Sequence, residues 1–392
     1  MNVGILTYHF ANNYGAVLQA YALQKQIEKM GLRCQIINYR PAETYQIGNA
    51  LTAFDNTESD KTDLPHNTNL LKSLERSAKQ FFTKVGLKKA KIDSRLLQYQ
   101  IFKRFSETYL KLGSKTYRTQ DSMRELNDQY DVFITGSDQV WNPRLFSMPF
   151  GEHESYFLDF VEEKRKKNAY SASFGISSYP QSSFRQLKYL LSQFNHISVR
   201  EESGIKIIQD AAGITVKQTL DPVFLMDRTE WDDFSPRKDY PPYVLVYTFG
   251  HSPKLHEYAN YLAKKFNLKI LQINVSECKC KGARKIQPAP EEFPGLFRDA
   301  QFVLVNSFHG CVFSIIFNKP FYIQYEDNAY TAETQTRFQS LLSLFHIDAG
   351  YVSCDRDIRH NDIDWSSVNQ ILETEKEKSK KFLTEILDIR SN

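Results

Sequence analysis

A single histidine follows a short apolar run, at a position where a side chain could handle protons. Residues 302–305 read Phe-Val-Leu-Val, and Asn306, Ser307 and His309 come before a second apolar run that starts at Cys311. A run of this length ahead of a helix predicts a buried parallel strand with these polar residues at its carboxyl end. Open α/β sheets bind ligands at that edge. The alternative is a ring that packs under the next helix and bonds to backbone.

A second polar loop, residues 136–142, follows the apolar run of residues 131–135. Asp138 supplies a carboxylate, Gln139 and Asn142 supply amides, and Trp141 supplies an apolar face. Sugar hydroxyls need polar partners and sugar C–H faces prefer an aromatic surface, so this mixture favours a sugar site. A loop with a purely structural role is the alternative.

Two more strand ends carry groups suited to a ligand. Arg200 stands at a strand-to-helix junction, where a guanidinium can fork onto a carboxylate or phosphate with support from helix amides. A surface ion pair with Glu201 or Glu202 is the alternative. Asn13, between the first strand and first helix, either faces the ligand edge or caps that helix. The chain has no GxGxxG pattern, which argues against a nicotinamide oxidoreductase.

Strand and helix patterns alternate along the whole chain, which predicts an α/β fold with mainly parallel sheets. The expected strands are residues 3–8, 34–39, 131–135, 169–174, 197–200, 243–249, 268–275, 302–305 and 321–325. The expected helices are residues 16–29, 70–85, 94–109, 253–266, 291–299, 311–317 and 368–387. Residues 42–69 are polar and rich in turn formers, which indicates an inserted loop.

The chain is long enough for two domains. Its 392 residues are 41% hydrophobic, and single cores stop growing well below that length. Prolines at 236, 241 and 242 interrupt any regular element between the two alternating sets. We therefore expect an N-terminal domain at residues 1–230, a second domain at 240–365 and a C-terminal helix at 366–392.

Charge and cysteine content exclude several classes of protein. The 50 basic and 46 acidic residues give a net charge of +4, too balanced for a nucleic-acid binder. We see no secretory signal and no apolar stretch of membrane-spanning length, so a cytoplasmic protein is expected. Five cysteines without paired zinc spacing fit a reducing compartment. We expect the Cys278–Cys280 pair in a surface loop, and no metal site.

These segments together resemble the polysaccharide pyruvyl transferase family, over roughly residues 3–345. The marks stand in the family's order, at residues 13–24, 136–142, 198–201, 221–222 and 307–310. The resemblance implies two Rossmann-like domains in a GT-B-like arrangement, with the acceptor on residues 1–230 and the donor on residues 240–365. It also implies a bacterial transferase that moves pyruvate from phosphoenolpyruvate to two hydroxyls of a hexose, as a cyclic ketal, in capsule or exopolysaccharide biosynthesis.

The resemblance also implies roles for single residues. His309 would handle protons, Asp138 would lie near the acceptor hydroxyls and Arg200 would bind the donor anion. Many relatives carry Arg where this chain has Ser307, so we expect Arg337 to supply the missing charge, unless it caps a helix or meets a surface carboxylate. The other expected substrate contacts are Asn13, Gly136, Ser137, Gln139, Trp141, Asn142 and Ser307.

Phosphoenolpyruvate would be a co-substrate, and the reaction requires no further cofactor. If the sugar acceptor is a lipid-linked oligosaccharide, the basic helices between residues 70 and 109 would rest on the inner face of the membrane; otherwise the basic runs at 84–91 and 163–167 are solvated helix faces. Two alternatives stay open. One is a GT-B-type glycosyltransferase that uses a nucleotide sugar, and the other is a non-catalytic glycan-binding relative.

Overall fold

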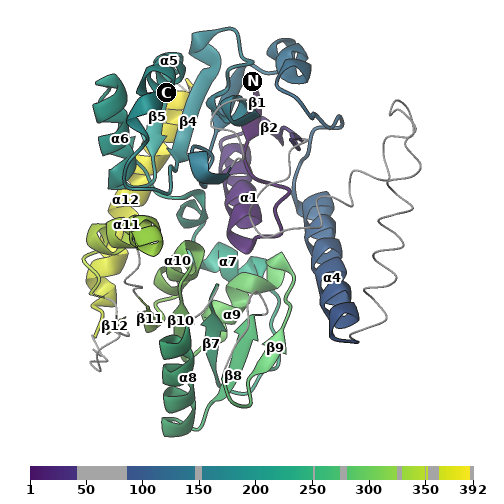
Figure 1. Cartoon of the computed structure of the whole chain (residues 1–392), viewed down its shortest axis with the longest axis vertical. Coiled ribbons are helices and arrows are strands. Elements are labelled where there is room, and N and C mark those ends of the chain that lie inside the picture. Colours follow the sequence, from purple (N-terminus) through teal and green to yellow (C-terminus); the bar gives the residue numbers. More distant parts are fainter. Residues whose placement is uncertain are drawn as a thin grey trace.

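The structure is a computed structural model with two α/β domains, one above the other in Figure 1. It describes residues 1–41, 86–145, 152–249, 252–273, 280–324, 329–348, 350–351 and 362–388. The loop expected at residues 42–69, the helix expected at 70–85 and Cys278 lie outside the described residues.

The first domain is built on a parallel sheet of six strands in the order β2-β1-β3-β4-β5-β6. The strands are β1 (Asn2–Leu6), β2 (Arg33–Ile36), β3 (Val132–Thr135), β4 (Lys167–Ala172), β5 (His196–Val199) and β6 (Lys217–Gln218). The helices are α1 (Tyr14–Lys29), α4 (Gly86–Tyr109), α5 (Phe184–Ser192), α6 (Glu202–Ala212) and α7 (Arg228–Phe234). Every residue of β3 and β4 is buried, as expected for strands covered on both faces.

The second domain repeats the plan with the strand order β12-β11-β10-β7-β8-β9, again with parallel pairing. The strands are β7 (Tyr243–Tyr247), β8 (Lys269–Ile273), β9 (Arg284–Ile286), β10 (Phe302–Val305), β11 (Phe321–Ile323) and β12 (Gly350–Tyr351). The helices are α8 (Pro253–Lys265), α9 (Phe293–Asp299), α10 (Phe308–Ile316) and α11 (Ala329–Leu344), and the C-terminal helix α12 (Trp365–Ile386) follows them. The predicted α/β class with two mainly parallel sheets is confirmed.

Two element boundaries change the interpretation of predicted site residues. Helix α10 begins at Phe308, so His309 lies in the first turn of a helix and not in a loop after the strand. Helix α11 spans Ala329–Leu344, so Arg337 lies in mid-helix and the helix-cap alternative for it is wrong. Helix α4 begins at Gly86, earlier than the predicted residue 94.

The C-terminal helix α12 returns to the first domain, where Figure 1 shows it in yellow beside β4 and β5. The Ser379 hydroxyl accepts a hydrogen bond of 2.9 Å from the Leu220 amide. The Phe382 ring is buried and lies 6.4 Å from the Tyr170 ring, and the Lys217 ammonium lies 2.8 Å from the Glu385 carboxylate. The chain therefore leaves the first domain, forms the second, and returns so that α12 packs on the first domain.

Helix α1 joins the two domains through aromatic packing. Tyr14 stacks on Phe293 of α9, with ring centroids 4.5 Å apart, and its hydroxyl donates to the Pro288 carbonyl at 2.8 Å. One apolar cluster contains buried residues of both domains, and within the first domain Tyr21 of α1 stacks on Phe234 of α7 at 4.7 Å. The interface is thus a continuous core, which fixes the position of one sheet relative to the other. No helix among the described residues has the length and apolar character to cross a membrane.

The return of α12 should contribute measurably to stability. We expect Phe382→Ala to destabilise the protein by about 3–5 kcal/mol, because it removes a buried aromatic ring and leaves a cavity. Lys378→Ala on the same helix is the control, since Lys378 is exposed in an i,i+3 ion pair with Glu375. Urea unfolding measures both. Equal midpoints for the two variants would show that α12 is not part of the core.

Candidate functional site

Polar side chains from both domains converge at the carboxyl ends of several strands. Asp138 follows β3, Arg200 follows β5, Asp221 follows β6, and His309 lies in the first turn of α10, just after β10. Ligands bind at this edge in open α/β sheets. The four residues, called the charged cluster below, lie together between the domains. Arg200, Asp221 and His309 are buried and Asp138 is partly exposed, and His309 is the contribution of the second domain.

Arg200 is the centre of this cluster. Its Nη1 lies 2.9 Å from Asp221 Oδ2, and its Nη2 lies 3.8 Å from Asp138 Oδ1. Its Nε lies 3.7 Å from Glu201 Oε2, and its guanidinium stacks 4.1 Å from the centre of the Phe308 ring. The side chain is only 1% exposed, so the alternative of a surface ion pair is wrong. Burial by itself disfavours the charge, but the surrounding carboxylates raise the pKa of Arg200.

Asp221 links Arg200 to His309. Its Oδ2 lies 3.0 Å from the Ser137 hydroxyl and 3.5 Å from His309 Nε2, and its Oδ1 accepts from the Val223 amide at 3.0 Å. Burial alone would raise the pKa of Asp221, but His309 and Arg200 hold it well below its usual range. A permanent carboxylate therefore faces the imidazole. The sequence marked Asp221 only as part of a family motif, because its partners are distant in the chain.

Glu201 is a second buried carboxylate whose role sequence reasoning missed. Its Oε1 accepts from the Ser173 hydroxyl and the Phe174 amide at 2.9 Å each, and from the Gly175 amide at 3.2 Å. These bonds hold the loop after β4 against the start of α6. The sequence shows that Glu201 is next to Arg200. It does not show that Glu201 is buried.

Arg337 reaches the same cluster from helix α11. Burial and the nearby Arg200 lower the pKa of Arg337 to about 10, while Glu201 and Asp138 act in the opposite direction. Both guanidiniums stay charged at neutral pH. Arg337 Nε, Arg200 Nε and Nη2, and His309 Nε2 are buried without a hydrogen-bond partner among the described residues. Two like charges and several free donors therefore meet in one place.

Ser137 and Gly136 shape the loop that presents Asp138. The Ser137 amide donates to Gln19 Oε1 at 3.1 Å, which ties the loop to helix α1. Gly136 has a φ of 106°, and a Cβ there would lie 2.3 Å from the Tyr170 carbonyl oxygen, so only glycine fits. Asp138 itself is partly exposed, with a side chain 15% accessible. Of this loop, Asp138 is the carboxylate that is open to a substrate.

Trp141 does not provide the apolar platform that we predicted. The residue is fully buried and stacks on Phe157 with ring centroids 5.0 Å apart, and its Nε1 donates to the Tyr156 carbonyl at 3.1 Å. The Asn142 side chain is also buried and donates to Gln139 Oε1 at 2.7 Å. The indole belongs to the core, where the rings of Phe157, Phe174 and Phe194 lie around it. This half of the loop is structural.

Asn13 and Ser307 are helix caps. Asn13 Oδ1 accepts from the Ala16 amide at 3.3 Å at the start of α1, and Ser307 Oγ accepts from the Gly310 amide at 3.0 Å at the start of α10. The cap alternative stated for Asn13 is therefore realised. Asn306 pins the loop after β7 through both the amide and the carbonyl of Phe249, at 2.7 Å each. Asn13 and Ser307 therefore position helix ends, and Asn306 positions a loop.

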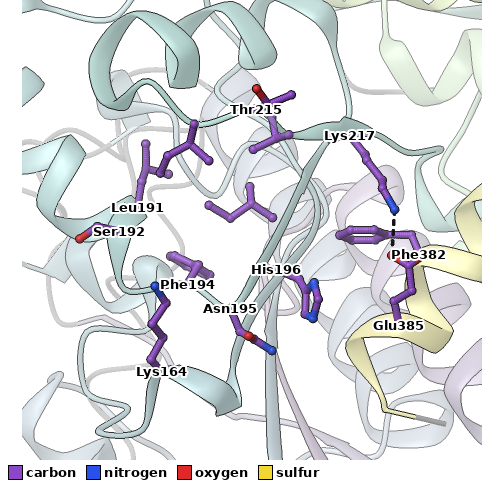
Figure 2. Close-up of a pocket in the computed structure, with 13 residues that line it drawn as sticks. Lys164, Leu191, Ser192, Phe194, Asn195, His196, Thr215, Lys217, Phe382 and Glu385 are labelled. Atoms are coloured by element: carbon purple, nitrogen blue, oxygen red, sulfur yellow. Dashed lines mark hydrogen bonds and ion pairs between the residues drawn. The ribbon is translucent and has the colours of Figure 1, made fainter. Parts of the chain in front are cut away.

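A surface pocket of about 450 Å³ lies elsewhere, where β5 begins and α12 passes (Figure 2). Its walls include His196, Lys217 and Phe382, and none of the charged-cluster residues lines it. His196 and Arg200 flank opposite ends of β5, so the pocket is at the far end of the sheet from the cluster. Among the described residues, no three His, Cys, Asp or Glu side chains are grouped to hold a metal ion.

Solved structures similar to this chain include two epimerases and a transferase. A putative UDP-N-acetylglucosamine 2-epimerase from Listeria monocytogenes has 8% identity and a TM-score of 0.49, covering 98% of this chain and 91% of its own. The UDP-GlcNAc 2-epimerase from Neisseria meningitidis has 10% identity, a TM-score of 0.46 and full coverage of both chains. The E. coli heptosyltransferase WaaC has 11% identity and a TM-score of 0.37, covering 95% and 99%. These scores support no argument about function.

Comparison at the level of sequence gives a sharper result. No curated protein matches the chain. A family model described as polysaccharide pyruvyl transferase matches residues 13–327, a span that contains the charged-cluster residues Asp138, Arg200, Asp221 and His309. The match covers most of the chain and runs across both domains, and this protein therefore belongs to the polysaccharide pyruvyl transferase family, a family of transferases in polysaccharide biosynthesis.

Proposed function

We propose that this protein moves pyruvate from phosphoenolpyruvate to two hydroxyls of a hexose, forming a cyclic ketal during surface-polysaccharide assembly. One observation carries the proposal: donor atoms of Arg200, Arg337 and His309 that have no hydrogen-bond partner among the described residues gather between the domains of a pyruvyl transferase family member. Phosphoenolpyruvate bears a carboxylate and a phosphate. Two guanidiniums suit such a pair of anionic groups, because each can donate two parallel hydrogen bonds.

Arg337 is the cation most available to the donor. Arg200 already contacts carboxylates, whereas no described residue forms an ion pair with Arg337. Burial and repulsion by Arg200 lower the pKa of Arg337, and an anion that bridges the two guanidiniums would relieve that repulsion. Ser307, where relatives carry arginine, is occupied as the cap of α10. We therefore assign the phosphate to Arg337, and the carboxylate to the Arg200 side of the cluster.

We assign to His309 the role of general acid and base. The methylene carbon of phosphoenolpyruvate must gain a proton before its C2 becomes electrophilic. A carboxylate such as Asp221, 3.5 Å from the ring, can orient an imidazole and stabilise the charge that it carries when protonated. Positioned proton transfer of this kind typically contributes 10²–10⁴-fold.

The atoms of the reaction balance without a further reagent. The first sugar hydroxyl adds to C2 as the methylene group becomes methyl, the C2–O bond to phosphate then breaks, and the second hydroxyl closes the ketal ring at C2. Of the two hydroxyl protons, one corresponds to the proton gained by the methyl carbon and the other leaves with inorganic phosphate. Asp138, the partly exposed carboxylate of the cluster, is our candidate to accept a proton from the acceptor.

Ligand-dependent stability and phosphate release test the function. We expect phosphoenolpyruvate at about 100 times its Kd to stabilise the protein by about 2.7 kcal/mol, and uridine or guanosine diphosphate to have no effect. Differential scanning fluorimetry measures the shift, and a phosphate assay with hexose acceptors measures turnover. Stabilisation by a nucleotide diphosphate alone would favour a glycosyltransferase. Sugar binding without phosphate release would favour a non-catalytic relative.

Replacement of the imidazole should stop chemistry without unfolding the protein. We expect His309→Ala to lower phosphate release by roughly 10²-fold or more, because the proton donor is lost. The control is His196→Ala, which removes an imidazole at the opposite end of β5. Circular dichroism verifies folding of both variants. Turnover close to wild type in His309→Ala would make its role structural.

Removal of the Arg337 side chain should selectively weaken binding of the donor, phosphoenolpyruvate. We expect Arg337→Ala to raise the KM for phosphoenolpyruvate by an amount equivalent to ~1.5–3 kcal/mol, the usual contribution of a charged hydrogen bond. Arg237→Ala is the matched control, since Arg237 is 70% exposed and pairs with Asp232 at the surface. Steady-state kinetics at varied phosphoenolpyruvate concentration measures the KM of both variants. An unchanged KM, or an equal change in both variants, would remove Arg337 from the donor site.

A further inference from the structure

The first turns of α1 and α10, one helix from each domain, meet at Gly15 and His309. A Cβ atom added to Gly15 would lie 2.0 Å from His309 Nδ1, 2.4 Å from its Cγ and 2.6 Å from its Cε1. Ordinary contacts of a Cβ atom begin at 3.4 Å. The imidazole therefore occupies the space that any side chain at residue 15 would need.

The backbone conformation gives no other reason for glycine at this position. Gly15 lies inside α1, where glycine is about 1 kcal/mol less favourable than alanine, and its φ is not in the left-handed region. Helix propensity favours alanine here, so the approach of the His309 ring is what requires glycine. On the other side of the imidazole, Asp221 Oδ2 lies 3.5 Å from Nε2. The ring is confined between helix α1 and that carboxylate.

We infer that Gly15 is a positioning residue for His309. By leaving room for the ring, Gly15 sets the distance between the imidazole and Asp221. It thereby sets the orientation of the proton donor. This inference rests on the proposed function, in which His309 transfers a proton. Because Gly15 and His309 belong to different domains, the proton donor reaches its working position only when the first turns of α1 and α10 are seated together.

The first experiment compares two glycine variants. Gly15→Ala should lower kcat about 10- to 100-fold with the donor KM changed less than about threefold, because a misplacement of about 1 Å is costly for proton transfer but spares the arginines. Gly113→Ala is the matched control: its Cβ would meet nothing nearer than 3.8 Å, so both constants should stay at wild type. An unchanged kcat in Gly15→Ala, or an equal loss in both variants, overturns the inference.

A second experiment separates positioning from general damage and does not depend on activity. In the His309→Ala background the ring is gone, so Gly15→Ala should no longer lower the urea midpoint and should cause no further loss of phosphate release. In wild type the same change should lower the midpoint and shift the Hε1 resonance of His309, which is identified by its loss in His309→Ala. Additive effects of the two substitutions, or an unmoved resonance, would contradict the inference.

The two experiments also distinguish this inference from the proposed function. If wild type releases no phosphate from phosphoenolpyruvate, the proposed function fails, and the assignment of Gly15 to proton transfer fails with it. The stability coupling and the resonance shift would then still report whether Gly15 positions the ring. If phosphate is released and the coupling is absent, only the Gly15 inference fails.

Discussion

The charged cluster depends on one buried ion pair, between Arg200 and Asp221, whose closest atoms are 2.9 Å apart. Removing two charges from water costs several kcal/mol per ion, and the cost is recovered only when further hydrogen bonds satisfy the remaining atoms. Ser137 and the Val223 amide do this for Asp221. On the Arg200 side, Nε and Nη2 have no hydrogen-bond partner among the residues that the structure describes. A pair built for stability alone would not leave such donors open.

The domain interface decides which groups can reach that pair. His309 comes from the second domain and touches the first through Gly15 and Asp221. Stacking of Tyr14 on Phe293 beside this point, and the return of α12, hold the sheets in a shared core. Rigid aromatic packing of this kind fixes the distance between groups that different domains contribute. Proton transfer in the proposed reaction therefore depends on apolar contacts that take no part in the chemistry.

The loop after β3 shows how closely structural and chemical roles can be interleaved. Within four residues, Asp138 faces the charged cluster and Trp141 is sealed in the core against Phe157. The buried indole of Trp141 anchors the loop, and the anchored loop fixes the position of the Asp138 carboxylate. The residue types that favour sugar binding also suit a loop anchored in the core. An aromatic ring can do either, depending on what covers its faces.

The sequence by itself was sufficient for the α/β class, the two parallel sheets, and the position of Arg200 and Asp138 after strands, since these follow from local periodicity and chain order. The family motifs also singled out His309. Only the tertiary structure decided that Trp141 is core, that Asn13 and Ser307 cap helices, and that Glu201 and Asp221 are buried partners of Arg200. Those outcomes depend on contacts between segments far apart in the chain. The reason for Gly15 is the clearest example, because a ring almost 300 positions away fills the space where its side chain would be.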